Sequence, residues 1–295
     1  MRAAWLRAHA REGPDGGALN TVTLLPAAGG GAVTRIAICA KHVVDVARVK
    51  IDKETNEPIL KGVGKKVSVA DKNAMEEALR LKDAVGGAQL VVYTVGTPDA
   101  KDCLKELLAM GADKAVILTP SVPLSQLDSL ATATILADAM RADGVPQIIV
   151  CGDASEDDTS SQVGPRLAEA LGISNVSIAL KTTGHTDRVE VSRDSGNGTI
   201  TIDARFPTLI TVTEETNKPR LPNIMQIMAA TKKPVELRGP ETLPSLQHPP
   251  VGLVPVRVVA LPSDRKGIIL KDLPAAEMAQ RVVADLKKAG LIGGD

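Results

Sequence analysis

Aromatic side chains are almost absent from this chain. Only Trp5, Tyr93 and Phe206 are aromatic among 295 residues, about 1% of the sequence. Proteins that bind single-stranded nucleic acid usually stack its bases on aromatic rings. The 35 basic and 35 acidic residues give a formal net charge of zero, so no broad basic field attracts polyanions. The composition therefore disfavours nucleic acid as a partner.

Cysteine and histidine are also few and scattered. The three cysteines, Cys39, Cys103 and Cys151, are an odd number without CxxC spacing, which does not suit a disulfide framework. A reducing, cytoplasmic location is the simpler expectation. The four histidines form no cluster with metal-ligand spacing, so no metal site is predicted.

Long apolar runs and catalytic motifs are missing as well. No run of about 18 apolar residues occurs, so insertion into a membrane is not predicted. The chain also lacks GxSxG, the GxxxxGK[ST] phosphate loop, HExxH and the GxGxxG dinucleotide pattern. No catalytic residue is therefore predicted.

What is present is a regular alternation of short apolar runs and helical patterns from Thr34 onward. The apolar runs predict strands at 35–40, 89–95, 114–118, 147–151 and 176–180. The helical patterns lie at 71–85, 98–110, 125–142 and 159–171. Wholly apolar strands between helices predict an α/β fold, with a parallel sheet covered by helices on both faces.

The style of the sequence changes after Leu180. Residues 188–192 and 198–202 predict an added antiparallel hairpin, and Thr208–Val212 is expected to join the edge of the sheet. We expect residues 1–33 to be a flexible extension and 34–232 an α/β domain. Residues 233–295 are expected to form an extended C-terminal arm, ending in a helix over 274–288, that wraps a partner subunit because it has too little periodic apolar surface to fold on itself. The first segment is rich in Ala, Gly and Arg, and a transit peptide is its alternative interpretation.

Ligands of such sheets bind beyond the carboxyl ends of the strands, where strand order reverses. This rule directs attention to the loops after Ala40, Val95 and Cys151. The loop 151–165 is small and polar and opens a helix, whose free N–H groups suit a phosphate. Its alternative interpretation is an acidic, well-capped surface loop. Lys41 and Gly96 fall at the same predicted edge, although either also fits an ordinary turn.

The segment 217–234 contains two prolines, Arg220 and a short helical pattern with Ile224, Met225, Ile227 and Met228. Apolar, methionine-rich surface beside charge suits adaptable contact with another protein. A helix that packs on its own core is the alternative.

Several segments resemble the beta subunit family of electron transfer flavoproteins, including its FixA-like members. The resemblance spans about residues 35 to 236. The matching pieces, in family order, are Ile36–Lys41, Asp71–Lys82, Leu107–Lys114, the loop from Asp157 to Pro165, and Pro219-Arg220 with Ile227-Met228 and Lys232–Pro234.

The resemblance implies an adenine-nucleotide-binding sheet. Ordinary members hold AMP there, and electron-bifurcating members hold a second FAD that receives a hydride from NADH. The redox FAD is held mainly by the alpha subunit of the heterodimer. Carried over by position, the nucleotide contacts are Cys39, Ala40, Lys41, Ser68, Val95, Gly96, Ser155, Asp158, Ser161, Gln162 and Val163.

The same resemblance implies that Arg220, Ile224 and Met225 dock onto dehydrogenase partners. The expected function is a beta subunit that passes electrons from acyl-CoA or related dehydrogenases to a quinone-reductase partner, as a carrier and not as an enzyme acting alone. The stretch 50–63 and the FixA-like character keep bifurcation with NADH open. A stand-alone adenine-nucleotide sensor is the alternative of another class, although it needs neither the proline-rich arm nor the segment 217–234.

Overall fold

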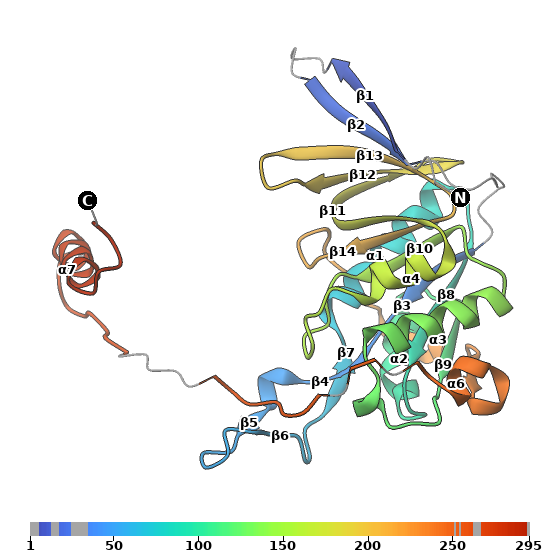
Figure 1. Ribbon diagram of the computed structural model, residues 1–295, viewed down its shortest axis with the longest axis horizontal. Coiled ribbons are helices and arrows are strands. Elements are labelled where there is room, and N and C mark those ends of the chain that lie inside the picture. Colours follow the sequence, from blue (N-terminus) through green and yellow to red (C-terminus); the bar gives the residue numbers. More distant parts are fainter. Residues whose placement is uncertain are drawn as a thin grey trace. The chain divides into compact units, whose positions relative to one another are not determined.

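The structure is a computed structural model that describes residues 6–12, 18–24, 35–250, 252–253, 255–261 and 267–293. Its main sheet has eleven strands in the order β1-β2-β13-β12-β11-β14-β10-β3-β8-β9-β15 (Figure 1). These strands are β1 (Leu6–Glu12), β2 (Ala18–Leu24), β3 (Arg35–Cys39), β8 (Gln89–Val95), β9 (Lys114–Leu118), β10 (Ile148–Gly152), β11 (Ser174–Gly184), β12 (Arg188–Asp194), β13 (Thr199–Arg205), β14 (Thr208–Val212) and β15 (Val235–Arg238). The short strands β4 (His42–Val44), β5 (Lys50–Ile51), β6 (Pro58–Ile59) and β7 (Lys65–Val67) lie outside it.

The α-helices are α1 (Val69–Ala84), α2 (Ala100–Met110), α3 (Ser129–Ala142), α4 (Val163–Leu171), α5 (Ile224–Ala230), α6 (Pro244–Gln247) and α7 (Ala275–Lys288). Single 3-10 turns lie at Val46–Arg48, Leu124–Gln126 and Pro240–Thr242. The first four helices start within four residues of their predicted positions. The largest differences are those of α3, which begins at Ser129 and not at Ser125, and of α4, which begins at Val163 and not at Thr159. A 3-10 turn at Leu124–Gln126 precedes α3, and residues 153–162 form an irregular loop before α4.

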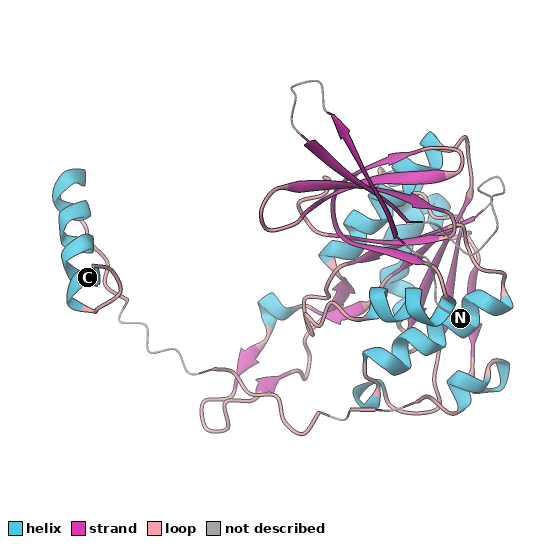
Figure 2. Ribbon diagram, turned by 45° about the horizontal axis from the view of Figure 1, so that its top comes forward, coloured by secondary structure: helices cyan, strands magenta, loops and turns pink. Residues whose placement is uncertain are grey.

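Neighbouring strands from β11 through β14, β10, β3, β8 and β9 to β15 run parallel. Their side chains alternate between two cores: Ile36 and Ile38 join a core with α1 and α2, whereas Ala37 and Cys39 join one with α3 and α4. Helices therefore flank the sheet (Figure 2). Strands buried on both faces must be apolar throughout, which is why the sequence pattern identified them. The predicted α/β fold is confirmed.

The structure differs from the sequence predictions in where some segments sit. The hairpin is confirmed as β12 and β13, which pair antiparallel. Thr208–Val212 was wrongly expected at the sheet edge: it forms β14, lies between β10 and β11, and is buried at every residue. The segment expected to open an extended arm at Lys233 instead continues the sheet as β15, parallel to β9.

Within residues 1–33, expected to be a flexible extension, the described ranges form β1 and β2. These two strands pair antiparallel, and β2 runs parallel to β13.

The chain divides into two compact units, residues 1–50 with 58–258 and residues 51–57 with 259–295. In the second unit the N–H of Ala260 donates to the carbonyl of Asn56 over 2.8 Å. The helix α7 matches the predicted range, and none of its residues is buried. Among the described residues, no helix combines the length and the apolar character that a membrane span requires.

Candidate functional site

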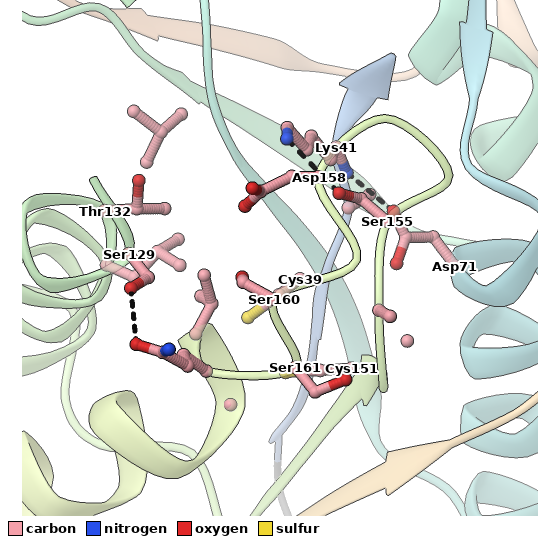
Figure 3. A pocket seen from close by; sticks show the side chains of 18 of the residues that line it. Cys39, Lys41, Asp71, Ser129, Thr132, Cys151, Ser155, Asp158, Ser160 and Ser161 are labelled. Atoms are coloured by element: carbon pink, nitrogen blue, oxygen red, sulfur yellow. Dashed lines mark hydrogen bonds between the residues drawn. The ribbon is translucent and has the colours of Figure 1, made fainter. Parts of the chain in front are cut away.

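The strand order reverses between β3 and β10. From β3 the chain adds β8 and β9 on one side, and β10 then pairs with the other side of β3. At the carboxyl ends of these strands lies a cavity of ≈ 200 Å³, closed on one side by the loop after β10 and on the other by the start of α3 (Figure 3). This is the place where an open parallel sheet binds its ligand.

Most of the predicted nucleotide contacts meet in this cavity. The predicted residues that line it are Cys39, Ala40, Lys41, Val95, Ser155, Asp158, Ser161, Gln162 and Val163. Ser68 and Gly96 do not line it. Ser68 is fully buried and its N–H donates to the carbonyl of Lys41 over 3.2 Å, and the Gly96 N–H donates to Leu118 over 2.9 Å. These two residues support the backbone around the cavity.

Two thiols lie where β3 and β10 end. Cys39 and Cys151 stand opposite each other in the strand register, and both are buried and free of disulfides. A hydrogen bond that the Cys151 thiol donates to the Cys39 side chain, together with burial, raises the pKa of Cys151 well above its usual value. A thiol with a raised pKa is a poor nucleophile, so Cys151 serves as a neutral wall of the cavity.

Lys41 occupies the exposed rim. Its Nζ lies 3.2 Å from Ser155 Oγ (Figure 3) and 2.8 Å from Asp157 Oδ1. The Ser155 hydroxyl itself donates to Asp157 over 2.7 Å. An exposed ion pair of this kind contributes little stability. Lys41 can therefore exchange the carboxylate for a ligand phosphate at small cost.

The end of the loop before α4 is bent and internally bonded. Thr159 and Ser161 adopt positive φ angles of 51° and 53°. The Ser161 hydroxyl donates to Asp153 Oδ2 over 2.9 Å, and Gln162 Oε1 accepts from Ser129 Oγ over 3.1 Å. Gln162 is the N-cap residue of α4, but its side chain does not cap the helix. The N–H groups of the first turn of α4 therefore keep their capacity to bind an anion.

The sequence did not reveal several lining residues, among them Asp71, Tyr93, Asp128, Ser129 and Thr132. Asp71 belongs to α1, yet its Oδ2 accepts the Lys41 N–H over 2.7 Å. Burial raises the pKa of this carboxyl to about 7. An acid in the first turn of a helix ordinarily complements the helix dipole, so no local signal marked Asp71 as part of a site.

Gly152 explains how β10 can end beside Asp71. A Cβ atom added at Gly152 would lie 2.5 Å from Asp71 Oδ1 and 2.9 Å from Ala70 Cβ. Only glycine permits this approach of the backbone to the carboxylate.

The expected docking segment presents its apolar side chains to solvent. Ile224 is 77% exposed and Met225 75%, at the start of a helix that Asn223 and Gln226 cap reciprocally. Arg220 is fixed: its Nε and Nη2 donate to Glu76 over 2.8 and 3.1 Å. Burial opposes ionisation of Glu76, but the bonds from Arg220 lower its pKa below the ordinary value. A helix that packs on its own core would bury Ile224 and Met225, so this alternative interpretation does not fit the structure.

Several known proteins are similar to this chain in sequence. The family model described as the electron transfer flavoprotein domain matches residues 59–241, more than half of the chain. The electron transfer flavoprotein subunit beta of Megasphaera elsdenii is 39% identical over 206 residues, covering 68% of this chain and 76% of the relative. The caffeyl-CoA reductase-Etf complex subunit CarD of Acetobacterium woodii is 30% identical over 270 residues, covering 88% and 100%.

The protein FixA of Azorhizobium caulinodans is 36% identical over 198 residues, covering 63% of this chain and 68% of the relative. The matched region contains the loop after β10, α4 and the segment with Arg220 and Ile224. The chain belongs to the electron transfer flavoprotein family, among its beta subunits and FixA proteins.

Proposed function

We propose that this chain is the beta subunit of a heterodimeric electron transfer flavoprotein and holds an adenine nucleotide, AMP or a second FAD, in the cavity at the β3–β10 switch point. The redox FAD is held mainly by the alpha subunit. The observation that carries the proposal is the convergence of nine predicted contact residues, far apart in the sequence, on one cavity. The relatives named as beta subunits support it.

The chemistry of the cavity fits such a nucleotide. Ser160, Ser161 and the first turn of α4 offer hydroxyl and N–H donors for phosphate, and Lys41 adds a positive charge at the rim. The exposed carboxylate of Asp158 can accept from ribose hydroxyls or an adenine amino group. Val95, Leu127 and Leu136 give the apolar surface that a base requires.

A bound FAD would supply the redox chemistry. The part of this chain is to bind and orient the nucleotide and to present a docking surface. In the proposed role the exposed Ile224 and Met225, next to the fixed Arg220, receive dehydrogenases that deliver electrons, and a quinone reductase accepts them. One apolar anchor beside a charge gives a slow dissociation and a selective encounter.

A second candidate function is electron bifurcation, in which NADH is oxidised at a second FAD in the cavity. The similarity to FixA proteins and to a subunit of a caffeyl-CoA reductase-Etf complex favours it. A stand-alone nucleotide sensor remains the contrasting proposal. It fits poorly with the apolar side chains that α5 exposes, because a sensor has no use for a docking surface.

The test is nucleotide analysis of the chain co-purified with its alpha subunit. The complex is denatured, and the released flavin and AMP are counted per heterodimer. One flavin with one AMP supports the carrier, and two flavins without AMP support bifurcation. The chain expressed alone should be free of flavin and poorly soluble. A stable yellow monomer, or a homodimer that holds nucleotide without any flavin partner, would contradict the proposal.

A further inference from the structure

One carboxylate joins the two strand ends that flank the switch point. Asp71 accepts the N–H of Lys41, just after β3, over 2.7 Å, and it also accepts the N–H of Gly152 at the end of β10. Figure 3 shows Asp71 reaching from α1 to this edge of the cavity. Because β3 and β10 separate here, the spacing of these two N–H groups sets the width of the site at its base.

The same carboxylate has little water, and among the described residues no side-chain cation forms an ion pair with it, although the Lys41 charge acts on it from nearby. Asp71 is 7% exposed, and the Lys41 ammonium bonds to Asp157 and Ser155 instead. Burial raises the pKa of Asp71 to about 7, against the opposing effect of the two N–H donors. The carboxyl is therefore shared between its charged and neutral forms near neutral pH.

We propose that Asp71 is a positioning residue of the nucleotide site, which clamps the N–H groups of Lys41 and Gly152 and takes up a proton when the nucleotide fills the cavity. The inference rests on the proposed nucleotide function and deepens it. A ligand in the cavity excludes the remaining water from the carboxyl, and its phosphate adds negative charge nearby. Both changes favour the neutral acid over the carboxylate.

The other acidic groups around the cavity also favour the neutral form of Asp71. Asp128, Asp153 and Asp158 line it, and Asp157 lies close enough to oppose ionisation of Asp71. Lys41 and His42 are the basic lining residues among those that the structure describes. Burial and Lys65 lower the pKa of His42, so that it stays neutral at pH 7. An incoming phosphate therefore meets several acids and a single ammonium, and neutralising Asp71 relieves that repulsion.

The test is calorimetry of AMP binding to the nucleotide-stripped heterodimer in two buffers of different ionisation enthalpy. FAD serves as a second probe, because its diphosphate carries no proton near pH 7. We expect the binding heat to depend on the buffer, which shows proton uptake. Affinity should fall by up to about tenfold per pH unit above pH 7. In Asp71→Asn the buffer dependence and the pH slope should disappear, and exchange of the Lys41 or Gly152 amide proton should become faster.

Asp113→Asn is the matched control. Asp113 Oδ2 accepts the Leu90 N–H over 2.8 Å at the opposite end of the sheet, so its loss should leave proton uptake unchanged. Nucleotide binding without proton uptake, or equal uptake in Asp71→Asn, would overturn the inference. If neither AMP nor FAD binds, the proposed function fails, and the proton uptake fails with it. Amide exchange then decides the clamp: unchanged exchange in Asp71→Asn refutes it, and faster exchange supports it.

Discussion

The Tyr93 hydroxyl donates to Asp143 Oδ2 over 2.8 Å, and Arg238 Nη2 donates to Asp143 Oδ1 over 2.8 Å. Three elements meet at this carboxylate: β8 through Tyr93, the end of α3 through Asp143, and the edge strand β15 through Arg238. Tyr93 also lines the cavity and is 1% exposed. One wall of the cavity is thereby fastened to the edge of the sheet.

Removing this hydroxyl should weaken the fold. Tyr93→Phe should lower the free energy of unfolding by about 1–2 kcal/mol, because a partly buried carboxylate loses a donor. Urea unfolding at neutral pH measures the change. Lys114→Ala, which removes a partly exposed ion pair with Glu236 on the same edge strand, is the control and should cost well under about 1 kcal/mol. Equal losses in the two variants would show that the Tyr93 hydrogen bond has no special weight.

The same tyrosine predicts a pH dependence. Burial and the bond to Asp143 raise the pKa of Tyr93 well above its ordinary value, so the stabilisation is fully present below about pH 10 and is lost as pH rises further. Tyr93 is the only tyrosine, so ultraviolet absorbance reports it alone. We expect no tyrosinate at about pH 10.5 in the folded chain and abundant tyrosinate in urea. Matching titrations in the two states would refute this.

Gly152 and Gly96 offer a contrast between two glycines at strand ends. Gly152→Ala places a Cβ against Asp71 and Ala70 and should destabilise the chain by about 1–3 kcal/mol, with loss of bound nucleotide. A Cβ at Gly96 meets Ala100 Cβ at an ordinary 3.6 Å, so Gly96→Ala should fold normally. Thermal melts and nucleotide content distinguish the variants. A stable Gly152→Ala protein with full nucleotide content would contradict the close approach.

The donors at the end of the loop predict a binding defect without unfolding. In the proposed complex Ser161 and Gln162 turn from Asp153 and Ser129 toward the phosphate. Ser161→Ala with Gln162→Ala should weaken nucleotide binding by roughly 1.5–3 kcal/mol for each hydrogen bond lost to a charged group. Equilibrium dialysis measures it. Ser195→Ala, in the β12–β13 turn, is the control with unchanged affinity. Full occupancy in the double variant would remove these residues from the site.

The exposed position of the Ile224 side chain predicts that its truncation affects docking and not stability. Ile224→Ala should leave the melting temperature unchanged but slow electron transfer from a dehydrogenase, because an interface anchor costs about 2 kcal/mol or more on truncation. Ile117→Ala, at 1% exposure in β9, should instead lower stability by about 2–5 kcal/mol. The measurements are thermal melts and a dehydrogenase-coupled flavin reduction assay. Normal transfer by Ile224→Ala would place docking elsewhere.

The sequence was sufficient to predict most helices and strands but not the order of the strands in the sheet. Runs such as 147–151 are apolar on both faces, and local composition reveals that directly. The place of Thr208–Val212 between β10 and β11 depends instead on how the preceding hairpin folds back, which no local pattern records. β15 was missed because the four residues Val235–Arg238 alternate with charge at an edge, where burial is incomplete.

The residues of the candidate site were likewise predictable from the sequence only in part. Loops after strands were predictable, because parallel strands bring their carboxyl ends to one edge. Asp71 was not, because its role depends on packing α1 against the ends of two distant strands. The wall formed by Asp128 and Ser129 was also missed, because the start of α3 reaches the cavity only through the crossover.

The hydrogen bonds that Asp128 accepts link the cavity thermodynamically to a distant segment of the chain. Its Oδ1 caps α3 at the Ala131 N–H, while its Oδ2 accepts the N–H groups of Gly252 and Leu253 at 3.2 and 3.0 Å. One carboxylate thus belongs both to the cavity wall and to the chain leading toward the C-terminus. Any protein that binds residues 252–253 and draws them away changes the hydrogen bonding of this wall. By reciprocity, whatever factor such binding imposes on nucleotide affinity, the nucleotide imposes on the binding of that protein.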